Sequence, residues 1–234
     1  MITFNPPLVK AIFVKRFKRF FIEVEYENQL LLAHIANTGS MLSLLNSGAE
    51  VLMQYKNDPK RKLAYSIEAI KHDGIWVGVN TMQPNRLIKK ALLEHDSLLK
   101  DYSYTKLTSE VKYGVNLDSK IDFLLENNQK KHFLEIKNVT LKQDNKALFP
   151  DSVSLRAQKH VHELMAEIKK GHQASLLFVV QRNDIQAFGI AQNIDPNYYD
   201  LVVQASKKGL QLKAISALIN ENKLCLVKEL PINL

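Results

Sequence analysis

The chain has 234 residues, of which 46% are hydrophobic, and it carries a formal net charge of +8. This length allows one large domain or two small ones, with enough apolar residues for a sizeable core. The single cysteine, Cys225, excludes an intrachain disulfide, and no apolar run approaches the length of a membrane-spanning helix.

The positive charge favours a polyanionic partner such as nucleic acid, although an ordinary basic protein has the same charge balance. Residues 1–7 lack the layout of a signal peptide, so we expect a cytoplasmic protein that does not contact a membrane.

Short strands are predicted throughout residues 1–80. The candidates are 9–14, 21–26, 30–34, 50–55, 63–70 and 75–79, and polar and apolar residues alternate most clearly at 21–26. This many short strands in so short a segment is typical of a small closed sheet. We therefore predict an OB-like barrel for residues 1–80, a fold that often binds oligonucleotides. An SH3-like barrel would give much the same pattern.

The pattern changes at Asn80. A helix is predicted at 84–95, followed by strands at 107–113, 120–125 and 132–141. Ser154 is placed to cap a helix that runs to about residue 170, and the continuous apolar run 174–180 indicates a central strand. A further helix begins at Pro196 and ends at Gly209, and two strands lie on either side of 220–222. This order predicts an α/β (α+β) domain with a mixed central sheet for residues 81–234.

Glu135 and Lys137 lie two residues apart in the predicted strand 132–141. Side chains at this spacing share one face of a strand, so Ile136 would point into the core. A neighbouring strand would bring the carboxylate of Asp122 beside them. Two carboxylates and a lysine that lie close together can bind a divalent cation and position a water molecule that attacks a phosphodiester.

The strand around Asp122 is otherwise apolar, and Ile121, Phe123 and Leu125 are expected to face the opposite layer. A carboxylate in such a strand needs a partner, because an unpaired buried charge is costly. A cation shared with Glu135 would supply one. The alternative is a salt bridge from Asp122 to Lys112, Lys120 or Lys137.

Each residue of this site has an expected role if the metal binds. Asp122 and Glu135 would be direct ligands of Mg²⁺ (or Mn²⁺), and the carbonyl of Ile136 a third oxygen ligand. Glu110, in the predicted strand 107–113, would complete the shell directly or through water. Lys137 would position or deprotonate the attacking water, or stabilise the charge that develops on the phosphorus. The predicted catalytic residues are therefore Glu110, Asp122, Glu135 and Lys137.

Two basic segments are candidates for nucleic-acid contacts. Residues 15–21 contain four cations and three aromatic rings, which suit phosphates and base stacking respectively, and we expect at least one of these rings to lie in the barrel core. In the helix after Ser154, three basic residues on adjacent turns would grip the scissile phosphate. A solvated surface is the alternative for both. The predicted nucleic-acid-binding residues are Lys15, Arg16, Lys18, Arg19, Phe20, Arg86, Arg156, Lys159 and His160.

Taken together, several stretches resemble the bacterial and archaeal sugar fermentation stimulation protein A family. They are residues 18–20, 34–41, 79–81, 85–87, 109–114, 121–123, 135–141, 149–151 and 158–160. The spacing from Asp122 to Glu135 and Lys137 also resembles the core of the PD-(D/E)xK nuclease superfamily. The resemblance implies an N-terminal OB-like domain, a C-terminal nuclease-like domain and DNA binding. The family name implies a link to the regulation of sugar (maltose) metabolism.

These observations lead to three functional hypotheses. The first is a DNA-binding protein with a divalent-metal-dependent nuclease site. The second is a DNA-binding regulator that uses the nuclease-like fold only for binding. The third is RNA binding or processing, which the barrel and the basic segment permit equally.

Overall fold

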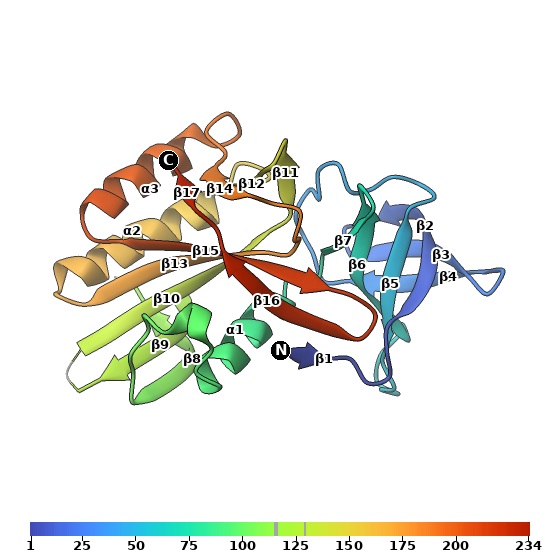
Figure 1. The fold of residues 1–234 in the computed structure, drawn as a ribbon, viewed down its shortest axis with the longest axis horizontal. Helices are drawn as coiled ribbons and strands as arrows, with labels where there is room; N and C mark the ends of the chain where they lie inside the picture. Colours follow the sequence, from blue (N-terminus) through green and yellow to red (C-terminus); the bar gives the residue numbers. More distant parts are fainter. Residues whose placement is uncertain (115–116, 129) are drawn as a thin grey trace.

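The computed structural model describes residues 1–114, 117–128 and 130–234. A closed barrel and a larger mixed sheet lie side by side, and the chain passes from the barrel to the sheet through α1 (Gln83–Leu93) (Figure 1). The protein is therefore α+β, with an OB-like barrel at the N-terminal end, as predicted.

The barrel consists of β2 (Val9–Phe17), β3 (Phe21–Tyr26), β4 (Gln29–Ile35), β5 (Glu50–Tyr55), β6 (Tyr65–His72) and β7 (Ile75–Gly78). The strand order is β4-β3-β2-β5-β6-β7, and a parallel pairing of β4 with β6 closes the sheet. Alternate residues of these strands, among them Ile22, Val24 and Ile67, fill the interior. This alternation is why the six strands could be located from the sequence.

The three rings of the basic segment lie outside this core. Phe17 and Phe21 are cross-strand partners at the end of the β2–β3 hairpin and stack on each other at 5.8 Å, and Phe20 is exposed. The expectation that one of them fills the barrel was wrong, because Ile22 and Val24 take the inward-facing positions of β3 and Phe21 alternates with them.

The larger sheet has seven strands in the order β1-β16-β15-β13-β10-β9-β8. Their bounds are β1 (Ile2–Thr3), β8 (Lys106–Tyr113), β9 (Ser119–Asn127), β10 (Lys130–Val139), β13 (Gln173–Val180), β15 (Gln211–Ile219) and β16 (Lys223–Glu229). The central strands β10, β13 and β15 are parallel and the outer pairings are antiparallel, so the sheet is mixed as predicted.

The first residues of the chain belong to this sheet and not to the barrel. β1 pairs with β16, and Phe4 and Leu8 are buried in the core cluster on the α1 side of the sheet. The assignment of residues 1–8 to the barrel is corrected accordingly.

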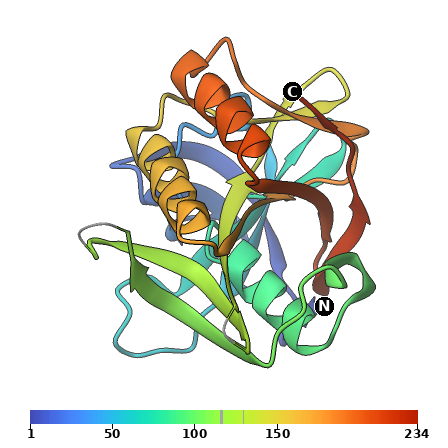
Figure 2. The same cartoon turned by 90° about the vertical axis from the view of Figure 1, so that its left-hand side faces the viewer.

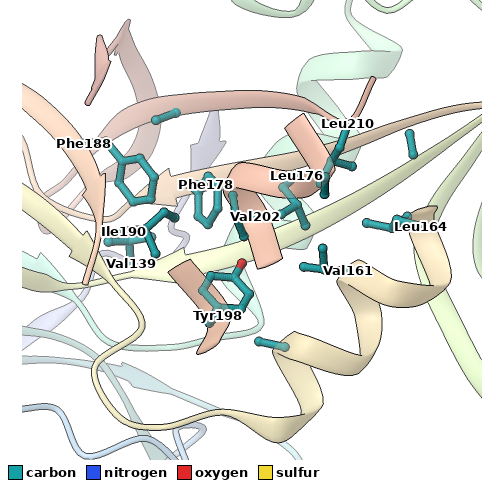
Figure 3. Packing of buried hydrophobic residues seen from close by; sticks show 14 of the residues in the cluster. Val139, Val161, Leu164, Leu176, Phe178, Phe188, Ile190, Tyr198, Val202 and Leu210 are labelled. Carbon is teal, nitrogen blue, oxygen red and sulfur yellow. The ribbon is translucent and has the colours of Figure 1, made fainter. Parts of the chain in front are cut away.

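Helices cover both faces of the large sheet (Figure 2). On one face lies α1 (Gln83–Leu93), whose apolar stripe packs with Leu134 and Leu177, followed by the 3₁₀ turn η1 (Ser97–Leu99). On the other face lie α2 (Leu155–Lys169) and α3 (Pro196–Lys207). Figure 3 shows residues of α2 and α3, including Val161 and Tyr198, packed around Leu176 and Phe178 of β13.

Side chains cap the two longer helices as their sequences suggest. The Ser154 hydroxyl accepts a hydrogen bond from the backbone N–H of Ala157, and the Asp195 carboxylate accepts one from that of Tyr198. These caps satisfy N–H groups that have no partner within the helix. None of the helices in the part of the chain that the structure describes is long and apolar enough to span a membrane.

A second, four-stranded sheet was not predicted. It consists of β11 (Leu141–Gln143), β12 (Lys146–Phe149), β14 (Ala187–Ile190) and β17 (Ile232–Asn233). The predicted strand 132–141 therefore ends early, at Val139. At Thr140 the backbone carbonyl accepts a hydrogen bond from the Arg182 guanidinium, and the chain then enters the second sheet.

Candidate functional site

The predicted acids lie where β9 and β10 separate. The last cross-strand pair is Phe123 with Leu134, and Asp122 and Glu135 take the next facing positions. There the Oδ2 atom of Asp122 accepts a hydrogen bond from the backbone N–H of Ile136 at 2.7 Å. The carboxylate thus replaces the strand partner that the N–H has lost.

The other oxygen of Asp122 is held from α1. Asn85 Nδ2 donates to Asp122 Oδ1 at 2.6 Å. Burial and the nearby charge of Glu135 raise the pKa of Asp122 to about 7, against the opposing effects of its hydrogen bonds and Lys137. In residues 1–114, 117–128 and 130–234 no lysine forms a salt bridge with Asp122, so that alternative is wrong.

Glu135, Lys137 and His160 form a buried cluster. Glu135 Oε1 accepts hydrogen bonds from Lys137 Nζ at 2.7 Å and from His160 Nδ1 at 2.5 Å, and the two nitrogens are 3.3 Å apart. Glu135 and Lys137 therefore share a face, as their spacing predicted. Burial would raise the pKa of Glu135, but the charges of Lys137 and His160 outweigh it and hold that pKa below its usual value.

The second oxygen of Glu135, Oε2, is buried and has no hydrogen-bond partner among the residues described. A buried carboxylate oxygen of this kind is costly unless something pairs with it. No group of three or more His, Cys, Asp or Glu side chains in the described ranges is placed to hold a metal ion by itself. Two carboxylates, one with a free oxygen, fit a cation such as Mg²⁺, which takes one or two protein carboxylates and keeps several waters.

Glu110 takes the register position opposite Asp122, because Ser109 pairs with Phe123 and Val111 with Ile121. Its backbone is left-handed, with φ of 56°, and its side chain is exposed. Its carboxylate makes no hydrogen bond or ion pair with any residue that the structure describes, so its place in a metal shell stays a prediction.

The residues of β9 do not alternate regularly between the two faces of the sheet. Ile121 packs with Leu124 on the α2 side of the sheet, whereas Phe123 and Leu125 pack on the α1 side. The expectation that Ile121, Phe123 and Leu125 share a face was therefore wrong for Ile121. In a β-strand the carbonyl and the N–H of one residue point to the same edge, so the carbonyl of Ile136 points toward Asp122, as its N–H does. Its role as a metal ligand stays a prediction.

The basic segment of the barrel divides into structural and exposed residues. The Arg16 guanidinium donates to the backbone carbonyls of Arg19, Asn37 and Gly39 at 2.6–2.9 Å, so it holds the loop after β4. Lys15 is exposed and forms an ion pair with Glu23 at 3.0 Å.

Lys18, Arg19 and Phe20 are exposed at the tip of the β2–β3 hairpin. The Phe20 ring lies parallel to the ring of His34, with 6.3 Å between centroids and 1° between planes, and it is 42% exposed. This tip presents two cations and an aromatic face to solvent.

The remaining predicted contacts do not form one surface. Arg86 and Arg156 are exposed, and Lys159 is exposed and paired with Asp118 at 2.8 Å. His160 lies instead on the buried side of α2, next to Glu135. The prediction that Arg156, Lys159 and His160 share one basic helix face was wrong for His160, because it continues the buried stripe formed by Ala157, Val161 and Leu164.

Sequence reasoning assigned no role to two further residues, Asn85 and Glu163. Asn85 positions Asp122, whereas residues 85–87 were noted only for their resemblance to a family, which gave Asn85 no role. Glu163 is 7% exposed and lies one turn after His160 on α2. Its spacing of three from His160 was an available signal, since residues at that spacing share a helix face.

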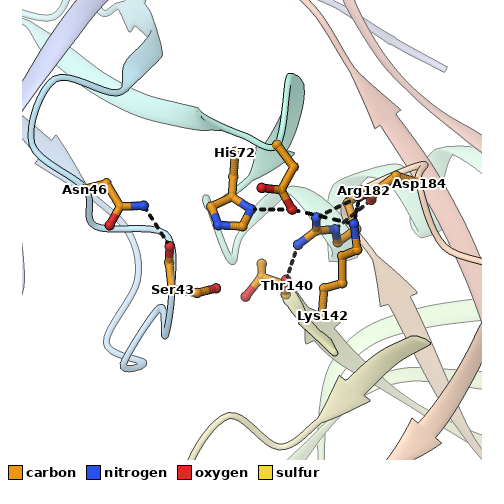
Figure 4. Close-up of polar contacts among 8 residues, drawn as sticks. Ser43, Asn46, His72, Thr140, Lys142, Arg182 and Asp184 are labelled. Carbon is orange, nitrogen blue, oxygen red and sulfur yellow. Dashed lines mark hydrogen bonds and ion pairs between the residues drawn. The ribbon is translucent and has the colours of Figure 1, made fainter. Parts of the chain in front are cut away.

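A polar network fixes the barrel against the domain that carries the site (Figure 4). Arg182 is fully buried and donates to both oxygens of Asp184, at 2.7 and 2.8 Å. Lys142 donates to Asp184 at 2.7 Å and lies 3.6 Å from Asp73, in the β6–β7 turn of the barrel. Burial opposes ionisation of Asp184, but Arg182 and Lys142 outweigh it and lower its pKa to about 2.

Known protein families and relatives match nearly the whole length of the chain. The family model "SfsA N-terminal OB domain" matches residues 14–79, and "Sugar fermentation stimulation protein RE domain" matches residues 82–223. A sugar fermentation stimulation protein homolog from Bdellovibrio bacteriovorus is 41% identical over 218 residues, which are 89% of this chain and 90% of that protein. A homolog from Crocosphaera subtropica is 43% identical over 212 residues, 88% of this chain and 87% of that protein.

A solved structure has the same fold. The Pyrococcus furiosus SfsA, in complex with Ca²⁺, superimposes with a TM-score of 0.88 at 23% identity, covering 97% of this chain and 96% of that one. The family models and the relatives agree over both parts of the structure, and the chain belongs to the sugar fermentation stimulation protein family.

Proposed function

We propose that this protein is a DNA-binding, divalent-metal-dependent nuclease that hydrolyses phosphodiesters. One observation carries the proposal: Asp122 and Glu135 take facing positions where β9 and β10 separate, with Lys137 and His160 bonded to one oxygen of Glu135 and its other oxygen free. Two acids, an amine and an imidazole lie close together here, and such groups can support metal-dependent hydrolysis of a phosphodiester.

The donors at this site are suited to a hard divalent cation. Carboxylate oxygens are preferred ligands of Mg²⁺ and Mn²⁺, and Asp122 and Glu135 are the residues that would hold the ion. The Pyrococcus furiosus relative is in complex with Ca²⁺, another cation that takes oxygen ligands, which supports the proposal for this chain. When bound, the ion would neutralise charge on the scissile phosphate and lower the pKa of a water molecule.

Each protein group near the acids has a role that its contacts suggest. Asn85 and the backbone N–H of Ile136 fix both oxygens of Asp122, so this carboxylate is oriented before any ligand arrives. Lys137 lies beside Glu135, where its amine is suited to orient the attacking water or to stabilise the negative charge of the pentavalent phosphorus. His160 holds the same oxygen of Glu135 from α2 and keeps the lysine and the carboxylate in place.

The tip of the β2–β3 hairpin supports a role for the barrel in nucleic-acid binding. Lys18 and Arg19 offer charge to phosphates, and the exposed ring of Phe20 offers a face on which a base can stack. Base stacking is equally available from RNA, so RNA is a second substrate class to be tested.

The alternative is a regulator that binds DNA without cleaving it. The described residues contain no group of three acids placed to hold a metal, which favours this second function. The relatives named as sugar fermentation stimulation protein homologs supply a link to sugar fermentation, and regulation of sugar (maltose) metabolism is the role that we propose for such a regulator.

The two functions separate in a cleavage assay. Purified protein is incubated with plasmid, linear and single-stranded DNA and with RNA, with Mg²⁺, Mn²⁺ or EDTA. The nuclease proposal requires cleavage that depends on the metal and is abolished by Glu135→Ala and by Lys137→Ala. Binding without cleavage of any of the four substrates would favour the regulator.

A further inference from the structure

The carboxylate of Glu163, on α2, is buried near the candidate site. Glu163 lies one turn after His160, its side chain is 9% exposed, and its Oε1 is 3.7 Å from Lys159 Nζ. A Cβ atom added to Gly114, just after β8, would lie 2.7 Å from Glu163 Oε1. The carboxylate is therefore packed against the backbone where β8 ends, beside the strand that carries Asp122.

Four buried oxygens in this region have no hydrogen-bond partner within the ranges that the structure describes. They are Glu135 Oε2, Glu163 Oε2 and the hydroxyls of Tyr113 and Tyr198. Native proteins rarely leave even one such group unsatisfied, and two carboxylate oxygens call for a donor or a cation.

The surroundings of Tyr113 place these groups near one another. Burial raises its pKa, and the negative charges of Glu135, Glu163, Asp122 and Glu167 raise it further. The Tyr113 hydroxyl thus lies within the field of all four carboxylates. Glu167 differs from Glu163, because its Oε1 accepts a hydrogen bond from Lys170 at 2.8 Å and it is absent from the set of unpartnered oxygens.

We propose that Glu163 is a positioning residue of the metal site, which accepts a hydrogen bond from a water molecule bound to the cation held by Asp122 and Glu135. A contact through water fits the structure, because no three acids among the described residues are placed for direct coordination. It also fits Mg²⁺, which keeps several of its waters in proteins. The inference rests on the proposed function and gives Glu163 the role that was predicted for Glu110.

Metal binding to the full-length protein tests this assignment without requiring turnover. Mn²⁺ is titrated by isothermal calorimetry into wild type, Glu163→Gln, Glu163→Asp, Glu110→Gln and the control Glu167→Gln. Loss of an outer-shell partner typically weakens metal affinity by about 10- to 100-fold. We expect a loss of about tenfold in Glu163→Gln and less than about twofold in Glu110→Gln and Glu167→Gln. Glu163→Asp keeps the charge and should recover most of the affinity.

Thermal unfolding in EDTA separates a role in the site from a role in folding. If Glu163→Gln does not fold, Glu163→Ala takes its place, and a loss of Mn²⁺ affinity is expected in Glu163→Ala but not in Glu110→Gln. Wild-type affinity in Glu163→Gln, or a tenfold loss in Glu110→Gln, would overturn the assignment of Glu163. A wild-type protein that binds no Mn²⁺ would overturn the metal site itself, and with it the proposed function.

Discussion

The carboxylate of Asp122 accepts a hydrogen bond from the backbone N–H of Ile136 at 2.7 Å, just past the last backbone pair between β9 and β10. This bond holds the acid in the gap between the strands, with Glu135 at the facing position. The two carboxylates are thereby held close together, which together with burial disfavours the ionised form of Asp122 in the absence of a cation.

The first prediction concerns Asp122→Asn, which keeps the shape of the side chain and removes its charge. We expect metal-dependent cleavage to fall on the order of a hundredfold or more, because a ligand is weakened. The metal-free variant should nevertheless be more stable than wild type by about 1 kcal/mol, since the like charge facing Glu135 is gone. Urea unfolding in EDTA measures this, and a clearly less stable variant would show that Asp122 is structural.

The second prediction separates Arg19 from Arg16. Arg19 is exposed at the hairpin tip, so Arg19→Ala should weaken DNA binding at low salt and flatten its salt dependence by about one phosphate contact. Arg16 bonds to three backbone carbonyls, so Arg16→Ala should instead lower the free energy of unfolding by about 1–3 kcal/mol. DNA titrations at several salt concentrations measure the slope, and an unchanged slope in Arg19→Ala would remove this tip from the binding surface.

The third prediction concerns the exposed ring of Phe20. Stacking of one base on an aromatic ring contributes about 1–3 kcal/mol, so Phe20→Ala should weaken binding of single-stranded DNA by at least about 1 kcal/mol. Leu30→Ala is the control, because Leu30 is 66% exposed and lies at the opposite end of the β3–β4 pair. Fluorescence anisotropy compares the two variants, and equal affinities would argue against stacking.

Much of this site follows from local patterns in the sequence. Alternation along β10 put Glu135 and Lys137 on one face, and a neighbouring strand was expected to bring Asp122 beside them, because these features depend on residues close together in the chain. The strands of the barrel and the caps Ser154 and Asp195 were found for the same reason.

Features that depend on segments far apart in the chain were not predicted from the sequence. The pairing of β1 with β16 and the small sheet of β11, β12, β14 and β17 join residues far apart in the chain. Likewise, the roles of Arg16 and His160 depend on what the fold places opposite them, a carbonyl-lined loop in one case and Glu135 in the other. A basic side chain in the sequence does not reveal whether it faces a phosphate or its own protein.

The fourth prediction concerns stability against pH. His132 is buried and bonded to Ser175 at 2.7 Å, and burial lowers its pKa from 6.5 to about 4. As the pH falls from 6.5 toward 4, the unfolded chain takes up a proton that folded His132 does not, so this residue lowers the free energy of unfolding by up to about 3 kcal/mol.

The variant His132→Gln removes this titration while keeping a polar group near Ser175. We expect it to be less stable than wild type near neutral pH, and the difference to shrink as the pH falls through this window. Urea unfolding at about pH 7 and about pH 4 tests this. A difference that stays constant over the window would show that His132 does not remain neutral in the fold.

The location of a bound ion tests the central claim most directly. Crystals of the protein soaked in Mn²⁺ should show an anomalous difference peak within about 2.5 Å of an oxygen of both Asp122 and Glu135. Mn²⁺ bound only elsewhere, or no peak at these two carboxylates, would contradict the claim that they form a metal site.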